Sequence, residues 1–327
     1  MRSFIIGGAG FIGSHLTDKL VEKGPVTIYD NLSVGKREFV AQHLASGAAT
    51  LVQKDALDLE GLTQAMAGHD VVFHLAANPE ARWGLERTRL DLEQGTIATY
   101  NVVEAMRLNK VPKIVFSSSG TVYSDTPEAC GEGDLGILPI SLYGASKFAG
   151  EALISAYVEC FGLNAMIFRF GNVVGPRGTH GAALDFLKKL RDAKTYLEVL
   201  GDGRQAKPYL HVTDCAAGLC FGLGHLEKKI ADAPKNAKTT RGQLQIFNLG
   251  PADFTSVRRI AEMCVAASPY PKAEIRYTGG ERGWPGDVPQ SRLKPDALAA
   301  AGFRVQYTSD QAVQMAVDAL TKEVFPG

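Results

Sequence analysis

The sequence lacks an excess of charge of either sign. Lysine and arginine together number 35, as do aspartate and glutamate, so the formal net charge at pH 7 is +0. Proteins that bind nucleic acids or anionic membrane surfaces usually carry a basic excess, which is missing here. The sequence also has no uninterrupted apolar run long enough to span a bilayer. We therefore expect neither a nucleic-acid partner nor a membrane partner.

Cysteine is scarce as well. The five cysteines are scattered, form no Cys-x-x-Cys pair and have no histidine at the spacing of zinc ligands. An odd and scattered set is typical of reduced thiols in a cytoplasmic protein. The N-terminus does not read as a secretory signal, because glycines interrupt its apolar stretch and Asp18 and Lys19 follow soon after. We expect a cytoplasmic protein without a metal site.

What the sequence does contain begins with an apolar strand, a glycine turn and a helix. The strand covers residues 3–6, the helical pattern runs to about residue 23, and the glycines between them recur every third position at Gly7, Gly10 and Gly13. Glycine permits a tight turn and close backbone approach, and the N-terminus of the following helix favours a pyrophosphate. This order of elements predicts a dinucleotide site.

A carboxylate at the end of the next strand refines that prediction. Residues 25–29 form the strand and Asp30 ends it, some twenty residues after the glycine turn. A carboxylate at this place binds the adenosine ribose hydroxyls and repels a 2′-phosphate. The predicted cofactor is therefore NAD, not NADP.

Short apolar strands then alternate with helical segments. We expect strands at 50–53, 70–75, 111–117 and 164–170, and helices at 92–108 and 142–161. This alternation predicts an α/β fold with a doubly wound parallel sheet, in which ligands lie beyond the carboxyl ends of the strands. After Pro176 the alternation fades, which indicates a smaller C-terminal substrate-binding lobe. The predicted division is a cofactor domain at 1–172, with segments returning near 207–225 and 244–250, and a substrate lobe over 173–327.

One pair of residues on the second helix suggests proton transfer. Tyr143 and Lys147 are four residues apart, so on a helix they share one face. A phenol with a pKa of about 10 is a poor base at neutral pH, and a nearby ammonium group together with a positively charged nicotinamide ring would lower that pKa. The pair predicts an acid–base device beside a redox cofactor.

With these segments in place, the chain resembles the nucleotide-sugar epimerase/dehydratase group of the extended short-chain dehydrogenases/reductases. The matching residues run in family order from the first strand nearly to the C-terminus. They are Gly7-x-x-Gly10-x-x-Gly13, Asp30, Asp55, His74-Leu75-Ala76-Ala77, Ser117-Ser118-Ser119 with Val122-Tyr123, Tyr143-x-x-x-Lys147, Arg169 to Pro176, Tyr209-Leu210-His211-Val212-x-Asp214, and Arg282 to Asp287.

The resemblance implies a Rossmann fold and a set of binding residues. The residues implied to bind NAD are Gly7, Gly10, Phe11, Ile12, Gly13, Asp30, Asn31, Asp55, Ala56, Leu75, Ala76, Ala77, Ser117, Tyr143, Lys147 and Phe170. Those implied to bind a nucleotide sugar are Ser119, Tyr143, Asn172, Arg204, Lys207, Tyr209, Arg282 and Asp287. The family usually carries Arg-Asp where this chain has Lys207-Pro208, and an arginine fork is not equivalent to a lysine point charge.

The resemblance also implies a mechanism. The catalytic residues would be Ser119, Tyr143 and Lys147: Tyr143 takes the proton from the sugar's 4-hydroxyl, carbon 4 delivers hydride to the nicotinamide, and Ser119 hydrogen-bonds the reacting oxygen. Lys147 would lower the pKa of Tyr143 and hold the nicotinamide ribose. Related dehydratases and decarboxylases place a glutamate or aspartate directly after the catalytic hydroxyl residue, whereas this chain has Gly120-Thr121. A 4-epimerase, which returns the hydride to the other face of the sugar, is the simplest outcome.

The substrate and several rivals stay open at this stage. In related sugar 4-epimerases a bulky tyrosine at the position of Ser291 excludes a 2-N-acetyl group, so the resemblance implies that both UDP-glucose/UDP-galactose and UDP-GlcNAc/UDP-GalNAc are candidate pairs. Glu80 and Arg82 could contact a charged sugar or lie at the surface. Rival activities on this scaffold are a nucleotide-sugar dehydratase, a 4-keto-sugar reductase and a UDP-glucuronate epimerase, and a rival from another class is a non-catalytic NAD-binding regulatory protein.

Two further expectations concern assembly and mobility. Family members usually dimerise through the helices at 92–108 and 142–161, so the resemblance implies a homodimer. Residues 227–243 are charged and polar with little apolar periodicity, which predicts a mobile surface excursion before a strand at 244–249.

Overall fold

The computed structural model describes all residues except 127, 135–137, 235–240, 281–291 and 327. The chain divides into two compact units, each built from three segments. The first unit contains Met1–Val122, Leu142–Arg169 and Ala216–Phe247, and the second contains Tyr123–Ser141, Phe170–Cys215 and Asn248–Gly327. Residues 123–141, which the sequence analysis counted with the cofactor domain, thus fall in the second unit.

A seven-stranded sheet organises the first unit. Its order is β11-β6-β5-β4-β1-β2-β3, so the chain winds outward in one direction from β1 to β3 and in the other from β4 onward. The pairs of β1 with β2 and β4, β2 with β3, and β4 with β5 are parallel. The predicted doubly wound parallel sheet is therefore confirmed. The strands are β1 (Ser3–Ile6), β2 (Val26–Tyr29), β3 (Ala49–Val52), β4 (Val71–His74), β5 (Lys113–Ser119), β6 (Asn164–Phe170) and β11 (Leu244–Leu249).

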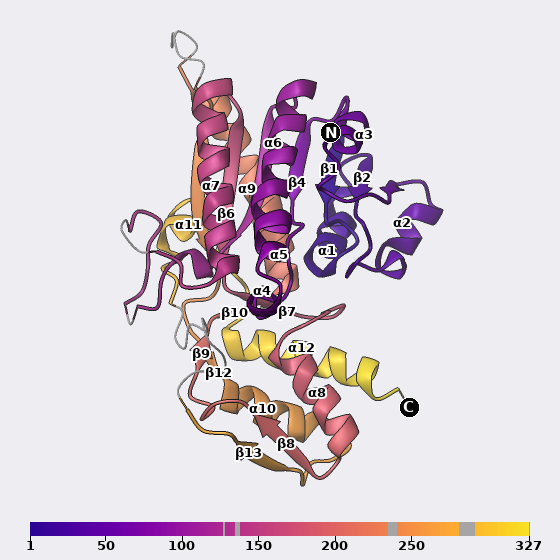
Figure 1. The fold of residues 1–327 in the computed structure, drawn as a ribbon, viewed down its shortest axis with the longest axis vertical. Helices are drawn as coiled ribbons and strands as arrows, with labels where there is room; N and C mark the ends of the chain where they lie inside the picture. The colour runs from indigo at the N-terminus through magenta and orange to yellow at the C-terminus, as the bar shows by residue number, and fades with distance from the viewer. Residues whose placement is uncertain (127, 135–137, 235–240, 281–291, 327) are drawn as a thin grey trace. The chain divides into compact units, whose positions relative to one another are not determined.

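Helices and helical turns connect these strands (Figure 1). They are α1 (Phe11–Leu20), η1 (Arg37–Val40), α2 (Ala41–Ala45), α3 (Leu59–Met66), α4 (Trp83–Glu86), α5 (Arg89–Asp91), the π-helical η2 (Leu92–Ile97), α6 (Ala98–Asn109), η3 (Gly120–Val122), α7 (Leu142–Phe161) and α9 (Val212–Asp232). The helix predicted for 142–161 matches α7. The one predicted for 92–108 begins instead as a π-helical turn, where a Cβ atom on Gly95 would lie 2.3 Å from Ser146 Oγ.

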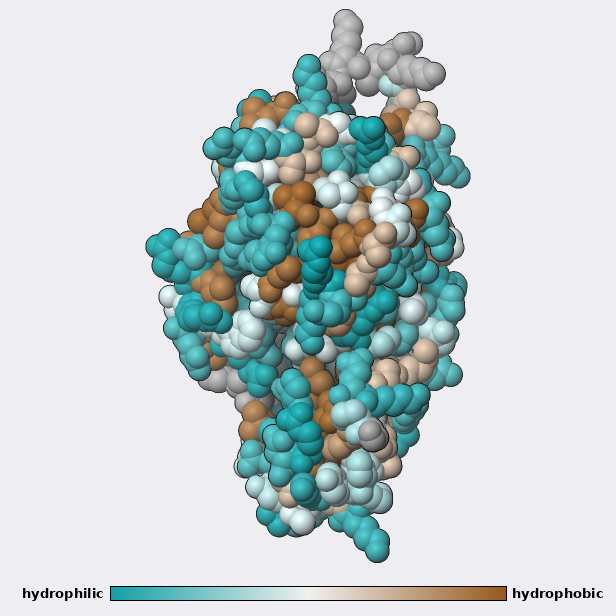
Figure 2. Space-filling view, turned by 90° about the vertical axis from the view of Figure 1, so that its right-hand side faces the viewer, coloured by the Kyte–Doolittle hydropathy of each residue, from teal (hydrophilic) through white to brown (hydrophobic). Residues whose placement is uncertain are grey.

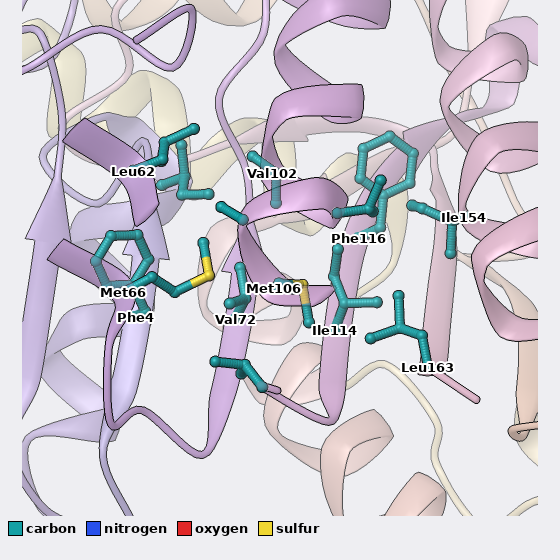
Figure 3. Packing of buried hydrophobic residues seen from close by; sticks show 14 of the residues in the cluster. Phe4, Leu62, Met66, Val72, Val102, Met106, Ile114, Phe116, Ile154 and Leu163 are labelled. Carbon is teal, nitrogen blue, oxygen red and sulfur yellow. The ribbon is translucent and has the colours of Figure 1, made fainter. Parts of the chain in front are cut away.

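A hydrophobic core lies between one face of the sheet and α3, α6 and α7. In Figure 3, side chains from the strands, such as Phe4, Val72 and Ile114, lie next to Met66 of α3 and Met106 of α6. All five side chains are fully buried. Removing a side chain of this size from such a core typically costs about 2–5 kcal/mol. The apolar strands predicted from the sequence therefore supply the side chains that the sheet packs into this core.

The segment predicted as a mobile excursion is partly helical, which corrects the sequence analysis. α9 continues to Asp232, and its last buried apolar side chains, Leu223 and Leu226, lie just before residue 227. Glu227 also forms an ion pair with Lys113 at 2.5 Å. Residues 235–240 lie outside the described residues. The strand predicted for 244–249 is β11.

The second unit combines three two-stranded sheets with helices. β7 (Asn172–Val174) pairs with β10 (Tyr209–His211), β9 (Ala206–Lys207) with β12 (Thr255–Ser256), and β8 (Tyr196–Val199) with β13 (Glu274–Tyr277). Its helices are α8 (Ala182–Ala193), α10 (Val257–Ala267), α11 (Asp296–Ala300) and α12 (Ser309–Val324), and α8, α10 and α12 share one apolar core.

No helix among the described residues is long and apolar enough to cross a membrane. The face of the molecule in Figure 2 carries hydrophobic patches separated by hydrophilic residues.

Candidate active site

The glycine turn after β1 has no room for larger residues. A Cβ atom on Gly13 would lie 2.1 Å from the carbonyl oxygen of Gly7, and one on Gly7 would lie 2.8 Å from the backbone nitrogen of Ala76. Gly7 also has a φ of +80°, which favours glycine. Gly10 caps α1 without a side-chain hydrogen bond, so Phe11 and Ile12 open a helix whose first N–H groups have no intrahelical partner. The turn fits a dinucleotide pyrophosphate, as the sequence predicts.

Asp30 holds the glycine turn against the end of β2. Its carboxylate accepts hydrogen bonds from the backbone N–H groups of Ala9 at 2.9 Å and Leu32 at 2.8 Å. Burial raises the pKa of this carboxyl, and the two backbone hydrogen bonds oppose that rise. Each oxygen keeps a lone pair, so the same carboxylate can accept hydrogen bonds from ribose hydroxyls.

The ends of β3 and β4 bring further predicted cofactor residues together. Asn31 Nδ2 donates to Asp55 Oδ2 at 2.7 Å, and the neighbouring Ala56 is buried. Leu75 and Ala76 both donate backbone hydrogen bonds to the carbonyl of Ile6, at 2.9 and 3.0 Å. This places the small residues after β4, Ala76 and Ala77, beside the glycine turn.

The first turn of α7 presents the predicted acid–base pair. Lys147 Nζ donates to the carbonyl of Ser117 at 2.7 Å and lies 5.9 Å from the centroid of the Tyr143 ring. The lysine is 3% exposed, and burial lowers its pKa to about 8, opposed by the charges of Glu151 and Asp91. Ser119 forms a hydrogen bond with Tyr143. The three predicted catalytic residues therefore lie in one cluster.

The pKa of Tyr143 is dominated by burial in the protein without its cofactor. Burial around its hydroxyl raises the pKa to about 12, the negative charge of Asp91 adds to that rise, and the hydrogen bond with Ser119 opposes it. The expectation from the sequence is that Lys147 and the nicotinamide ring together lower this pKa when NAD is bound. In the protein alone the lysine does not offset the desolvation of the phenol, because burial disfavours the charged phenolate.

Asp91 is a site residue that sequence reasoning missed. It is 1% exposed at the end of α5, and its Oδ1 accepts a hydrogen bond from the buried Asn78 side chain at 3.0 Å. Its Oδ2 is buried and has no hydrogen-bond partner among the described residues. Its charge acts on both Tyr143 and Lys147. A single aspartate in a polar segment carries no sequence signal that distinguishes it from a surface residue.

Glu151 was also missed, although its position on α7 gave a usable signal. It follows Lys147 by four residues and so lies one turn further along the same face. Arg169 pairs with both of its carboxylate oxygens, at 3.0 and 2.7 Å, and Ser118 Oγ donates to it at 2.5 Å. All three are at most 6% exposed. This buried network joins the ends of β5 and β6 to the helix that carries Tyr143 and Lys147.

The predicted substrate residues in the described chain fall mainly in the second unit. Asn172 of β7 is in register with Tyr209 of β10. Lys207 lies two residues before Tyr209 and ends the preceding strand, β9. Arg204 has a side chain 85% exposed and pairs with Asp202 at 3.7 Å. Phe170, predicted to contact the cofactor, also belongs to the second unit. Arg282, Asp287 and Ser291 lie outside the described residues.

Glu80 and Arg82 form a bidentate ion pair with each other. Arg82 Nε donates to Glu80 Oε1 at 2.9 Å and its terminal nitrogen to Oε2 at 2.7 Å. The pair neutralises both charges, which favours the surface alternative over a contact with a charged sugar.

Comparisons with known proteins agree with this geometry. A family model described as the NAD dependent epimerase/dehydratase family matches residues 3–236. A protein of Methanocaldococcus jannaschii, provisionally named a UDP-glucose 4-epimerase, is 34% identical over 281 residues, which cover 84% of this chain and 83% of that protein. A crystal structure of a UDP-galactose 4-epimerase is 36% identical, with a TM-score of 0.85, over 99% of this chain and 100% of that one. The UDP-glucose 4-epimerase of Thermus thermophilus, solved in complex with NAD, is 28% identical, with a TM-score of 0.80, over 98% and 99%.

Proposed function

Because this chain belongs to the NAD dependent epimerase/dehydratase family, we propose that it catalyses the 4-epimerisation of a UDP-sugar, with UDP-glucose and UDP-galactose as its substrate pair. The chain is an NAD-dependent nucleotide-sugar epimerase, and NAD is its cofactor. The family resemblance read from the sequence is thereby confirmed. The particular sugar, the position of epimerisation and the roles of individual residues are what we propose.

The cluster of Ser119, Tyr143 and Lys147 carries the proposal. Tyr143 accepts the proton of the sugar's 4-hydroxyl, and Ser119 hydrogen-bonds the oxygen that loses it. When bound, NAD supplies a hydride acceptor for carbon 4 of the sugar and a positive charge that favours the Tyr143 phenolate. Lys147, fixed by the carbonyl of Ser117, keeps two N–H donors for the nicotinamide ribose.

The residues after Ser119 favour epimerisation over elimination. Removing water across two sugar carbons requires a further acid–base pair, and a carboxylate next to the catalytic hydroxyl would supply it. In this chain Gly120 has no side chain, and the hydroxyl of Thr121 donates to Ser119 at 2.9 Å. The 4-keto sugar that forms then has one simple fate, which is reduction on its opposite face.

The cofactor cradle is proposed to comprise the residues grouped around the glycine turn. Gly7, Gly10 and Gly13 leave space for the pyrophosphate, Asp30 accepts from the adenosine ribose, and Asp55 with Asn31 lies at the adenine end. We place the nucleotide of the substrate against Asn172, Lys207 and Tyr209 of the second unit.

We also propose that the protein is a homodimer formed through α6 and α7. Apolar side chains are exposed along these helices and the preceding turn: Ile97, Tyr100, Leu108, Phe148 and Phe161. Tyr157 donates to Glu104 at 2.9 Å, which links the two helices into one surface. A second copy of this chain is the partner that would cover that surface.

The test uses the purified protein without added cofactor. UDP-glucose and UDP-N-acetylglucosamine are supplied separately in heavy water, and proton NMR follows the products. We expect a galacto-configured product without deuterium. The hydride that leaves carbon 4 for the cofactor is the one that returns to carbon 4, so no hydrogen from the solvent is incorporated there. Deuterium at carbon 5 or a 4-keto-6-deoxy product would establish elimination chemistry instead.

The matched variant is Tyr143→Phe, which removes the proposed base and keeps the ring. It should lower kcat by about 100- to 10,000-fold, the usual contribution of general acid–base catalysis, while the protein retains NAD. A variant with undiminished turnover would contradict the role of Tyr143. Activity of the wild type on neither sugar would favour another nucleotide sugar or a regulatory role.

A further inference from the structure

The hydroxyl of Ser119 is held by a residue to which no role has been given. Thr121 donates two hydrogen bonds to Ser119 Oγ, one from its hydroxyl at 2.9 Å and one from its backbone N–H at 3.2 Å. A serine hydroxyl has two acceptor lone pairs and one proton. With both lone pairs occupied by Thr121, the proton of Ser119 is the one polar position left for Tyr143.

The direction of these hydrogen bonds matters for Tyr143. Ser119 can donate to the phenolic oxygen, and a donated hydrogen bond stabilises a phenolate more than a phenol. The hydrogen bond with Ser119 is the one interaction that lowers the pKa of Tyr143 against burial and the charge of Asp91. Without Thr121, the hydroxyl of Ser119 could rotate and accept a hydrogen bond from Tyr143, which would favour the neutral phenol.

Local structure keeps Thr121 in place. The helical turn η3 (Gly120–Val122) follows directly on β5, and Gly120 and Val122 are buried on either side of Thr121. The threonine stands in the segment where related dehydratases carry an acid. In this chain the position therefore supports the catalytic serine and supplies no carboxylate.

We propose that Thr121 is a positioning residue, whose hydroxyl and backbone N–H fix Ser119 so that its proton points at the oxygen of Tyr143. The inference rests on the proposed function in taking Tyr143 as the proton acceptor. It goes beyond that function in assigning the orientation of Ser119 to the residue two positions later.

Other charged groups around Tyr143 stay unchanged when Thr121 is altered. Asp91 of α5 raises the pKa of Tyr143, and Lys147 lies on the same helix. Glu151 acts on Lys147, and His74 of β4 is buried and neutral, since burial and Lys147 lower its pKa to about 3. A change seen on substitution of Thr121 would therefore come from Ser119.

The first readout needs no substrate. Ionisation of Tyr143 is followed by ultraviolet difference absorbance of tyrosinate, with Tyr143→Phe subtracting the other tyrosines. Thr121→Val keeps the shape and loses the hydroxyl, and it should raise the pKa of Tyr143 by about one unit, whereas Thr121→Ser should restore the wild-type value. Equal titration in wild type and Thr121→Val would overturn the proposal. Thr121→Ala provides the same comparison if the valine variant does not fold.

The second readout is kinetic. Thr121→Val should lower kcat about tenfold near neutral pH, change KM little, and shift the rising limb of the kcat profile upward by about one pH unit. A uniform loss of kcat at all pH values, or failure of Thr121→Ser to recover, would mean a structural role only. If the wild type epimerises no sugar, the proposed function fails while the tyrosinate titration still decides the role of Thr121.

Discussion

At the scale of single residues, the site is a balance of buried charges. Arg169 and Glu151 are paired through two hydrogen bonds, and the positive charge of Lys147 is favoured by the charges of Glu151 and Asp91. Burial lowers the pKa of Lys147 and raises that of Asp91. Each group thus depends on the other for its charge in a low-dielectric environment. The pKa of Tyr143, the neutral member of the cluster, is raised by burial and by the charge of Asp91.

Asp91→Asn should change the pH dependence of the reaction. The asparagine accepts the same hydrogen bond from Asn78 but carries no charge, so the pKa values of Tyr143 and Lys147 both fall. Since the phenolate is the active base, the rising limb of the pH profile of kcat should move to lower pH by about one unit. The pH profile of kcat measures this shift.

The control for this prediction is Asp192→Asn, because the Asp192 side chain is 69% exposed and lies in α8. It should leave the profile unchanged. A limb that stays in place or moves upward in Asp91→Asn would show that Asp91 does not act on Tyr143 through its charge.

At the scale of elements, α7 carries both the proposed catalytic pair and the residue that holds the helix against the sheet. Its first turns carry Tyr143 and Lys147, and the next turn carries Glu151, which holds the ends of β5 and β6 through Ser118 and Arg169. The Arg169–Glu151 ion pair is buried, so water cannot solvate either charge if the pair is broken. Catalytic geometry and helix–sheet packing are therefore coupled through a single network.

Glu151→Gln should destabilise the protein strongly. Loss of the carboxylate breaks the buried ion pair with Arg169, which typically costs about 3–5 kcal/mol. The free energy of unfolding, measured by denaturant titration, checks this value.

Glu159→Gln on the same helix is the matched control. Glu159 pairs with Arg241 at 2.9 Å, but both side chains are about half exposed or more, at 49% and 62%. Exposed pairs contribute about 0–1 kcal/mol, so this variant should stay close to the wild type. Similar losses in both variants would contradict the distinction between the buried and the exposed pair.

At the scale of the whole molecule, the sequence order does not follow the units. The first unit is built from three segments and the second from three others, so the chain passes repeatedly between them. The segment after the catalytic serine, Tyr123–Ser141, belongs to the second unit, whereas α7 directly after it belongs to the first. Residues proposed to hold cofactor and residues proposed to hold substrate thus alternate along the chain.

Phe148→Glu should separate the proposed homodimer. Phe148 is 41% exposed on α7, and a buried charge in an apolar interface is unfavourable. We expect a shift from dimer to monomer by size-exclusion chromatography with light scattering. Met315→Glu, at 37% exposure on α12, is the control and should leave the dimer intact. A wild-type monomer would refute the proposed assembly directly.

The sequence by itself determined the sheet, the glycine turn and the family. Apolar strands alternating with helices read as a parallel sheet because burial on both faces imposes continuous hydrophobic runs. The spacing of Gly7, Gly10 and Gly13 predicted a tight turn, and the structure leaves no space for a Cβ atom at Gly7 and Gly13. Tyr143 and Lys147 could be paired because helical periodicity fixes neighbours four residues apart.

The tertiary structure alone decided which polar residues are buried and what they contact. Asp91 and Asn78 are thirteen positions apart, yet a hydrogen bond of 3.0 Å joins them inside the protein. Neither periodicity nor composition encodes such a meeting, since it depends on how α5 and the loop after β4 pack. The same holds for the pKa of Tyr143, because desolvation arises from all surrounding elements at once. Local patterns fix local geometry, whereas electrostatics in the site follows from the packing of distant segments.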